Sequence, residues 1–121
     1  MKNQTTNPFF ELEERTFQFA KTVRLFVKTL PRTIGNIEDV KQLIRSSGSV
    51  GANYREANES LGKKDFLMRM RISRKEAKES SYWLRIIAET NQLNNINEAK
   101  KLHNEAEELR KIMSSIIEKS K

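Results

Sequence analysis

The chain has no cysteine, one histidine, two prolines and four glycines among its 121 residues. Without cysteine there are no disulfide bonds, thiolate metal sites or cysteine nucleophiles. No apolar run approaches the roughly 18–20 residues of a membrane span, and the polar N-terminus lacks the features of a signal peptide. We therefore expect a cytoplasmic protein that does not enter a membrane, with long regular elements interrupted at few points.

Positive charge is in excess. The sequence holds 23 Lys and Arg against 16 Asp and Glu, a formal net charge of +7. Such a balance favours polyanionic partners, most often nucleic acid, although many small proteins are basic without binding one. The length fits a single domain, and a hydrophobic content of 36% suffices for one modest core.

Four stretches carry apolar residues at the three- and four-residue spacing of a helix. They span about residues 9–30, 37–61 and 63–91, and a fourth helix begins near Ile96. Residues 1–8 are predicted as a disordered tail and residues 9–121 as a single domain. Short connections make neighbouring helices antiparallel, so the sequence predicts an all-α fold, an up-down-up-down four-helix bundle. A long coiled-coil hairpin is the rival architecture, and the spaced breaks argue against it.

The breaks between the helices contain residues that commonly start or end a helix. Pro31 is predicted to end the first helix, with Asn36 as the N-cap of the second. Gly62 is placed to cap the C-terminus of the second helix. Asn95, followed three residues later by Glu98, resembles a capping box at the start of the fourth helix.

Small residues interrupt the second helix where its apolar spacing predicts continuous structure. Gly48 and Gly51 stand in mid-helix, although glycine there costs about 1 kcal/mol relative to alanine. This cost indicates that another segment approaches the backbone closely, either within the protomer or between chains. A small, polar stripe beside the core face would let another helix pack closely and form hydrogen bonds. Its members are Ser46, Ser49, Asn53, Glu56 and Ser60.

The third helix has a basic face. Six cations fall within an arc of about 100° when each residue advances the helix by 100°, and Tyr82 lies among them. These cations are Lys64, Arg71, Arg74, Lys75, Lys78 and Arg85. Clustered cations with an aromatic residue suit a phosphate backbone, so we predict that this face binds RNA or DNA. Two alternatives have the same pattern. The basic face could be exposed to solvent alone, or it could pair with acids of a neighbouring chain.

The opposite flank of the third helix is acidic and also carries apolar residues outside the main core stripe. These residues are Met68, Ile72, Trp83 and Ile86. An apolar patch of this kind is typical of an oligomer interface. The alternative is a wide core that reaches around the helix.

Candidate catalytic groups are sparse. A di-iron bundle site needs Glu-x-x-His pairs, whereas His103 follows Lys100 at that spacing. Glu56 and Glu59 form a possible carboxylate pair without an accompanying base or ligand set. The sequence contains no glycine-rich phosphate-binding motif, and its serines lie in helices rather than on shaped turns. We therefore predict a non-catalytic protein with no cofactor and no metal site.

The run over residues 45–57 carries a family resemblance. It resembles the four-helix-bundle proteins encoded in bacterial 23S rRNA intervening sequences, also called S23-like proteins. The similarity covers roughly residues 17–117, and Phe66, Ala77, Ser80, Trp83 and Leu84 form its second part. In the run itself the matching residues are Arg45, Ser46, Ser47, Ser49, Val50, Asn53, Tyr54, Glu56 and Ala57.

The resemblance implies antiparallel four-helix protomers and no catalytic residues. Related proteins, including accessory proteins of diversity-generating retroelements, form homopentameric rings with basic surfaces and associate with nucleic acid and a reverse transcriptase. The resemblance assigns Arg45, Ser46, Ser49, Asn53 and Glu56 a structural role at a helix or subunit contact. We expect a homo-oligomeric RNA- or DNA-binding protein, pentameric by resemblance. The alternative is an oligomeric scaffold that docks a protein such as a reverse transcriptase.

Overall fold

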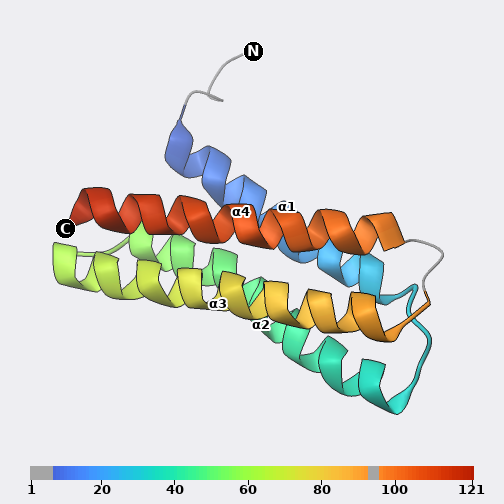
Figure 1. The fold of residues 1–121 in the computed structure, drawn as a ribbon. Helices are drawn as coiled ribbons and strands as arrows, with labels where there is room; N and C mark the ends of the chain where they lie inside the picture. Colours follow the sequence, from blue (N-terminus) through green and yellow to red (C-terminus); the bar gives the residue numbers. More distant parts are fainter. Residues whose placement is uncertain (1–6, 93–95) are drawn as a thin grey trace.

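The computed structural model describes residues 7–92 and 96–121, which form four helices joined by short connections. They are α1 (Pro8–Val27), α2 (Ile34–Asn58), α3 (Lys63–Thr90) and α4 (Ile96–Ser120). Figure 1 shows α3 and α4 running antiparallel along the bundle, while the first turns of α1 extend away from it. The all-α four-helix-bundle prediction is confirmed. Residues 1–6 of the predicted tail and the predicted cap Asn95 lie outside the described residues.

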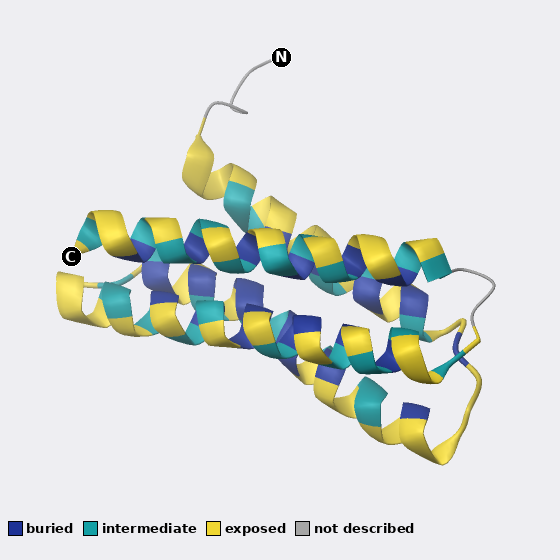
Figure 2. Ribbon diagram, viewed as in Figure 1, coloured by how far each residue is buried: buried dark blue, intermediate teal, exposed yellow. Residues whose placement is uncertain are grey.

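The core runs along the centre of the bundle, where each helix buries one stripe (Figure 2). Helix α1 buries Phe19 and Phe26, and α2 buries Leu43 and Tyr54. Helices α3 and α4 complete the core with side chains at the same three- and four-residue spacing, because only one face of each helix meets the others. The buried apolar residues of these two helices are Met70, Ala77, Leu84, Ile87, Ala99, Leu102, Ala106, Leu109, Met113 and Ile117.

Helix α2 begins earlier than predicted, and Asn36 is not its N-cap. Thr33 is the cap, because its side-chain oxygen accepts from the Asn36 backbone N–H at 3.1 Å. Asn36 lies inside the helix, is only 3% exposed, and exchanges two hydrogen bonds of 2.7 and 2.9 Å with the amide of Asn91. The prediction failed because Thr33 supplies the capping oxygen one turn earlier. The amide of Asn36 instead links the start of α2 to the end of α3.

Gly62 also differs from its predicted role. Helix α2 ends at Asn58 with Glu59 as its C-cap, so Gly62 lies beyond the end of the helix. Its φ and ψ of −165° and 170° are those of extended backbone, and it is the N-cap residue of α3. The last turn of α2 is closed by tight backbone hydrogen bonds from Glu59 to Glu56 and from Ser60 to Ala57, both 3.1 Å. A left-handed glycine is therefore not needed there.

The glycine of the second helix that requires close packing is Gly51, and its neighbour is α1. A Cβ added at Gly51 would lie 2.8 Å from Oγ1 and 3.1 Å from Cβ of Thr16. Both residues are buried. The close contact predicted from the sequence is therefore present within the protomer, at the crossing of α1 and α2.

Serines allow a similarly close approach between α2 and α3. The hydroxyls of Ser46 and Ser80 are 2.8 Å apart, and Ser73 donates to the backbone carbonyl of Val50 at 2.7 Å. All three serines are fully buried. Each buried hydroxyl therefore has a partner, as a low-dielectric interior requires, and the small side chains keep the two helices close.

We expect Gly51→Ala to lower the free energy of unfolding by up to about 2 kcal/mol, because overpacking against Thr16 exceeds the gain in helix propensity. Gly48→Ala is the matched control in the same helix. Its Cβ would meet only the end of the Arg24 side chain, at 3.3 Å, so we expect unchanged or higher stability. Chemical denaturation of both variants checks this. Equal stabilities would contradict the close contact.

Candidate nucleic-acid interface

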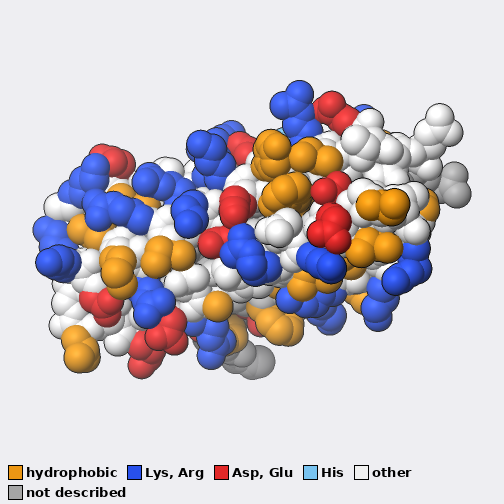
Figure 3. Space-filling view, turned by 90° about the horizontal axis from the view of Figure 1, so that it is seen from below, with side chains coloured by type: hydrophobic (Ala, Val, Ile, Leu, Met, Phe, Trp, Pro, Cys, Tyr) orange, Lys and Arg blue, Asp and Glu red, His pale blue; other side chains and the backbone are white. Residues whose placement is uncertain are grey.

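The basic residues predicted on the third helix lie on the side of α3 that faces away from the core. Lys64, Arg71, Lys75, Lys78 and Arg85 are exposed, and Arg74 is partly buried. Met70, Ser73, Ala77 and Leu84 occupy the buried side of the same helix. Figure 3, seen from below the view of Figure 1, shows Lys and Arg side chains spread along the molecule with hydrophobic side chains between them. The basic residues of α3 therefore lie on a different side of the helix from its buried stripe.

Most of these cations have no acidic partner. Across residues 7–92 and 96–121, the ion pairs within 4.0 Å include none for Lys64, Arg71, Arg74, Lys75 or Lys78. Unpaired cations lining one face produce a positive potential that attracts a polyanion. These five residues are called the basic face below.

Arg85, the sixth predicted cation, differs from the others. Its Nε donates to Glu89 at 2.9 Å, one turn later on the same helix. This hydrogen bond raises the pKa of Arg85. Since Glu89 already neutralises part of its charge, Arg85 contributes less to an anion site than the basic face does.

The basic face also influences the end of α4. The pKa of Glu118 is lowered, first by its hydrogen bond with Lys121 and further by the charges of Arg74 and Arg71. The two arginines therefore lie close enough to α4 to act on its last acidic side chain, although they form no ion pair with it. Glu118 is therefore an acidic neighbour of Arg71 and Arg74 that lies outside ion-pair distance.

The predicted interface residues divide into two kinds. Trp83 is partly buried and packs against the core, as the wide-core alternative expects. Its indole Nε1–H is buried and has no hydrogen-bond partner among the described residues. Met68 is 46% exposed, whereas Ile72 and Ile86 are partly buried. The oligomer interface stays a prediction, and Met68 is the residue of this set with the most surface available.

A groove lies over the first half of α3 and joins the apolar set to the basic face. Met68 and Ile72 supply apolar surface to it, and its volume is about 870 Å³. Four cations line it: Lys63, Lys64, Arg71 and Lys75. The groove therefore combines an apolar surface with a positively charged rim. The sequence placed these residues on adjoining sectors without indicating that an open, shallow groove lies between their side chains.

The residues of the family motif connect α2 to α3 within one chain. Arg45 donates to both oxygens of Glu79 at 2.9 and 3.0 Å, and its Nη1 lies 3.4 Å from Glu76. The charge of Glu76 is the largest cause of the raised pKa of Arg45. Further along, the Asn53 side-chain oxygen accepts from Arg69 at 3.2 Å. With the Ser46–Ser80 contact, these bonds support the structural role that the resemblance assigns.

The other two motif residues contribute less. Glu56 is exposed, and its backbone carbonyl accepts from the Ser60 hydroxyl at 3.3 Å. Ser49 is partly buried, and its carbonyl accepts from the side chain of Asn53 at 2.9 Å. The predicted polar stripe thus faces α3 in part, and it also forms hydrogen bonds within α2 itself.

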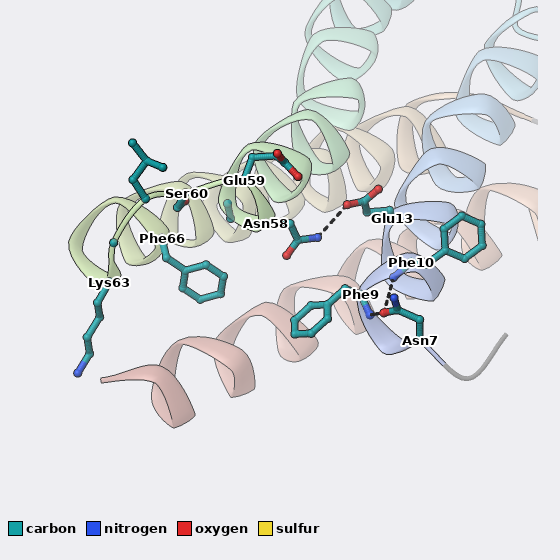
Figure 4. Close-up of a pocket in the computed structure, with 12 residues that line it drawn as sticks. Asn7, Phe9, Phe10, Glu13, Asn58, Glu59, Ser60, Lys63 and Phe66 are labelled. Carbon is teal, nitrogen blue, oxygen red and sulfur yellow. Dashed lines mark hydrogen bonds between the residues drawn. The ribbon is translucent and has the colours of Figure 1, made fainter. Parts of the chain in front are cut away.

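A second groove, of about 730 Å³, lies where the start of α1 meets the turn between α2 and α3. Figure 4 shows Phe9 and Phe66 beside this groove and Glu13 at its far side. The Glu13 carboxylate accepts from Asn58 at 2.9 Å and lies 3.6 Å from Arg55. The Glu13 carboxylate therefore links α1 to the last turn of α2. The sequence analysis did not predict this groove, and the adjacent Phe9 and Phe10 are the signal that could have suggested it.

Residues 7–92 and 96–121 contain neither a metal-binding cluster nor a membrane-spanning helix. There, no group of three or more His, Cys, Asp or Glu side chains is arranged to hold a metal ion. His103 is partly buried on α4. None of the helices is both long and apolar enough to span a bilayer.

Fold and surface together define a small, basic four-helix-bundle protein. The chain belongs to the 23S rRNA-intervening sequence protein family, whose sequence model matches residues 10–115. It is similar in structure to a protein of unknown function from the S23 ribosomal protein family of Bacteroides thetaiotaomicron VPI-5482, with a TM-score of 0.75 and 29% identity. That match covers 87% of this chain and 96% of the other. No protein with a curated description matches the chain.

We expect Arg45→Gln to destabilise the bundle by about 1–3 kcal/mol, because Glu76 is buried and would lose its charged partner. Lys41→Gln is the control, since its Glu38 pair is solvent-exposed and should contribute less than about 1 kcal/mol. Chemical denaturation measures both variants. In Glu76→Gln, the further substitution Arg45→Gln should cost less than it does in the parent. If Arg45→Gln lowered the free energy of unfolding equally in the parent and in Glu76→Gln, the result would contradict a stabilising interaction between Arg45 and Glu76.

Proposed function

We propose that the protein is a non-catalytic, homo-oligomeric nucleic-acid-binding protein of the cytoplasm, and that the basic face of α3 contacts RNA or DNA. The observation that carries the proposal is the absence of acidic partners for Lys64, Arg71, Arg74, Lys75 and Lys78 within the described chain. A cation that is already paired gains little from a phosphate. An unpaired one releases condensed counterions when it binds, which favours binding entropically.

The spacing of the basic face suits a phosphate backbone. Residues 71 and 78 lie about 10 Å apart along the helix at 1.5 Å per residue. This distance corresponds to about three steps along one strand of a duplex, at an axial rise of 3.4 Å per phosphate. Contacts of this type position a nucleic acid without reading its sequence. The name of the family, which refers to 23S rRNA, is consistent with an RNA partner.

Assembly into a homo-oligomer, with five copies as the resemblance implies, would repeat the basic face around a ring. Its proposed contact surface includes Met68, Ile72, Trp83 and Ile86 of α3. The exposure of Met68 supports this assignment most directly, because an apolar side chain gains most from burial when water covers much of it before assembly.

A protein-interaction scaffold is the second candidate, and the surface of α1 favours it. Phe9, Phe10, Phe17 and Leu25 are each more than half exposed. Large apolar side chains in this number on one helix are typical of a protein contact. The partner would be another copy of the chain or a protein such as a reverse transcriptase. Such a scaffold would bind generic RNA or DNA weakly at about 150 mM salt, which distinguishes it from the first candidate.

Light scattering coupled to size exclusion should give a mass above that of one protomer at tens of micromolar. The physical reason is the apolar surface that α3 leaves exposed around Met68. A monomer would contradict assembly through this surface. A dimer would retain the interface and reject the five-membered ring.

Replacing Arg71, Arg74, Lys75 and Lys78 together by Gln should weaken binding to generic RNA and duplex DNA. Each lost phosphate contact should reduce the slope of log affinity against log salt by about 0.9 on duplex DNA. Glutamine preserves helix propensity, so helicity and mass should stay unchanged. Fluorescence anisotropy across a salt series measures the effect.

The matched control removes four cations from other parts of the surface, by changing Lys21, Arg32, Lys100 and Lys101 to Gln. These residues are exposed, and within the described chain they form no ion pair. The control changes net charge equally and should retain most of the salt slope. Equal losses in both variants would show that net charge alone attracts nucleic acid. Parental affinity in the basic-face variant would defeat the proposal.

A further inference from the structure

We infer that the outer face of α1 is a second contact surface, on which α1 of another copy packs antiparallel about a two-fold axis beside Phe17. This inference goes beyond the proposed function, because it concerns a different helix from the basic face and from the contact proposed around Met68. Within the described residues, α1 packs against α2 and α4 but not against α3. The two contact surfaces therefore belong to helices that do not adjoin each other.

Helix α1 carries two apolar stripes. Its core stripe includes Phe19 and Phe26, which are buried. Phe10, Phe17 and Leu25 lie on the opposite side of the helix, in one line and about two helical turns apart. Each of these three side chains is more than half exposed. Polar residues normally occupy the outer face of a bundle helix, so the second stripe indicates a partner.

The charges on this outer face are separated along the helix. Glu14 lies in the first half of α1 and Lys21 in the second, and both are exposed. Neither forms an ion pair within residues 7–92 and 96–121. About 10 Å of helix separates them, which is too far for a direct pair within one helix. An acidic half and a basic half therefore remain available to an outside partner.

An antiparallel second copy brings these groups together. If Glu14 of one copy faces Lys21 of the other, Phe10 faces Leu25 in the same register, because both pairs are centred on one point of the helix, between residues 17 and 18. A two-fold axis at that point repeats each pair and brings the two Phe17 rings together. A parallel arrangement would instead oppose Glu14 to Glu14 and Lys21 to Lys21, which like-charge repulsion disfavours.

Other kinds of partner fit this face less well. A nucleic acid or an anionic membrane would attract Lys21 and repel Glu14. An unrelated protein would need the same charges in the reverse order. A second copy supplies that order by symmetry alone. The complementarity of charge therefore selects another copy of the chain.

The contact is small, and this determines how it is tested. A helix of the length of α1 is about 30 Å long and about 10 Å wide, so one face offers less than the roughly 800 Å² per partner of a standard interface. We therefore expect association that depends strongly on protein concentration. If copies also assemble through α3, the α1 contact would join two such assemblies. The basic face would stay accessible, because α3 does not adjoin α1.

The test reverses the two charges one at a time and then mixes the variants. Glu14→Lys opposes two lysines across the contact and Lys21→Glu opposes two glutamates, so each variant alone should associate at least about tenfold more weakly than the parent. An equimolar mixture should regain nearly parental association, because every opposed pair again joins a lysine to a glutamate. Sedimentation equilibrium from micromolar to millimolar protein, at about 100 mM salt, measures the parent, each variant and the mixture.

Three further variants separate this contact from a general loss of charge or apolar surface. Phe17→Gln removes the ring beside the axis from both copies and should weaken association at least about tenfold. Leu61→Gln is its matched control and should keep the parental mass, because Leu61 is fully exposed in the turn between α2 and α3. Lys21→Gln removes only an attraction between exposed groups, so its effect should be smaller than that of Lys21→Glu. Circular dichroism establishes that each bundle is intact.

Several results would overturn the inference. Parental association in both charge-reversal variants would reject the contact, and so would a mixture that associates no better than either variant alone. The contact proposed on α3 is judged separately, by the mass that remains. Charge-reversal variants with half the parental mass would retain both contacts, whereas monomeric ones would leave α1 as the source of all association. A parent that stays monomeric at millimolar concentration would reject both.

Discussion

The rest of the structure depends on the close approach of α2 to its two neighbours. On one side Gly51 leaves room for Thr16 of α1, and on the other Ser46 meets Ser80 of α3. Larger side chains at these positions would separate the helices and leave the apolar stripes only partly in contact. Packing density in a core is high enough that even a methyl group matters. The small residues of α2 therefore determine how closely the bundle closes and how α3 is rotated within it.

Polar contacts on both sides of α3 then fix that rotation. Towards α2, Arg45 binds Glu76 and Glu79. Towards α4, Ser81 donates to Glu107 at 2.6 Å, and this bond is the main cause of the lowered pKa of Glu107. With its acids Glu76 and Glu79 engaged towards α2, α3 turns its unpaired cations to the remaining side. The same bonds that stabilise the fold thus produce the basic face.

Helical periodicity repeats over many residues, so the sequence predicts the features that depend on it. These are the number of helices, their approximate positions and the sectors of α3. Asn36 and Gly62 were assigned wrongly because a helix end depends on competition between nearby residues. Thr33 lies one turn before Asn36, and a polar partner such as Asn91 is invisible without the tertiary fold. Periodicity also left the neighbour of Gly51 open, since it shows that space is required without showing what fills it.

For the candidate site, too, helical periodicity was predictable from the sequence, whereas tertiary contacts were not. Angular position on a helix predicted which cations of α3 share a side, but Trp83 lies where a wide core and an interface give the same pattern. Its contact with the core depends on how far the neighbouring helices reach around α3. The groove over Met68 was also beyond prediction, because a hollow depends on side-chain conformations and on the turn before Lys63.

Helices α3 and α4 differ both in the amount of charge and in its arrangement. Helix α4 carries five cations and five acids, whereas α3 carries eight cations and four acids. On α4, Arg110 and Lys111 pair with acids three residues earlier. On α3, Glu76 and Glu79 are engaged by Arg45 of another helix, so they do not neutralise the basic face. Arg45 thus has a second effect beyond stability, since it keeps two acids of α3 away from the cations that a polyanion would meet.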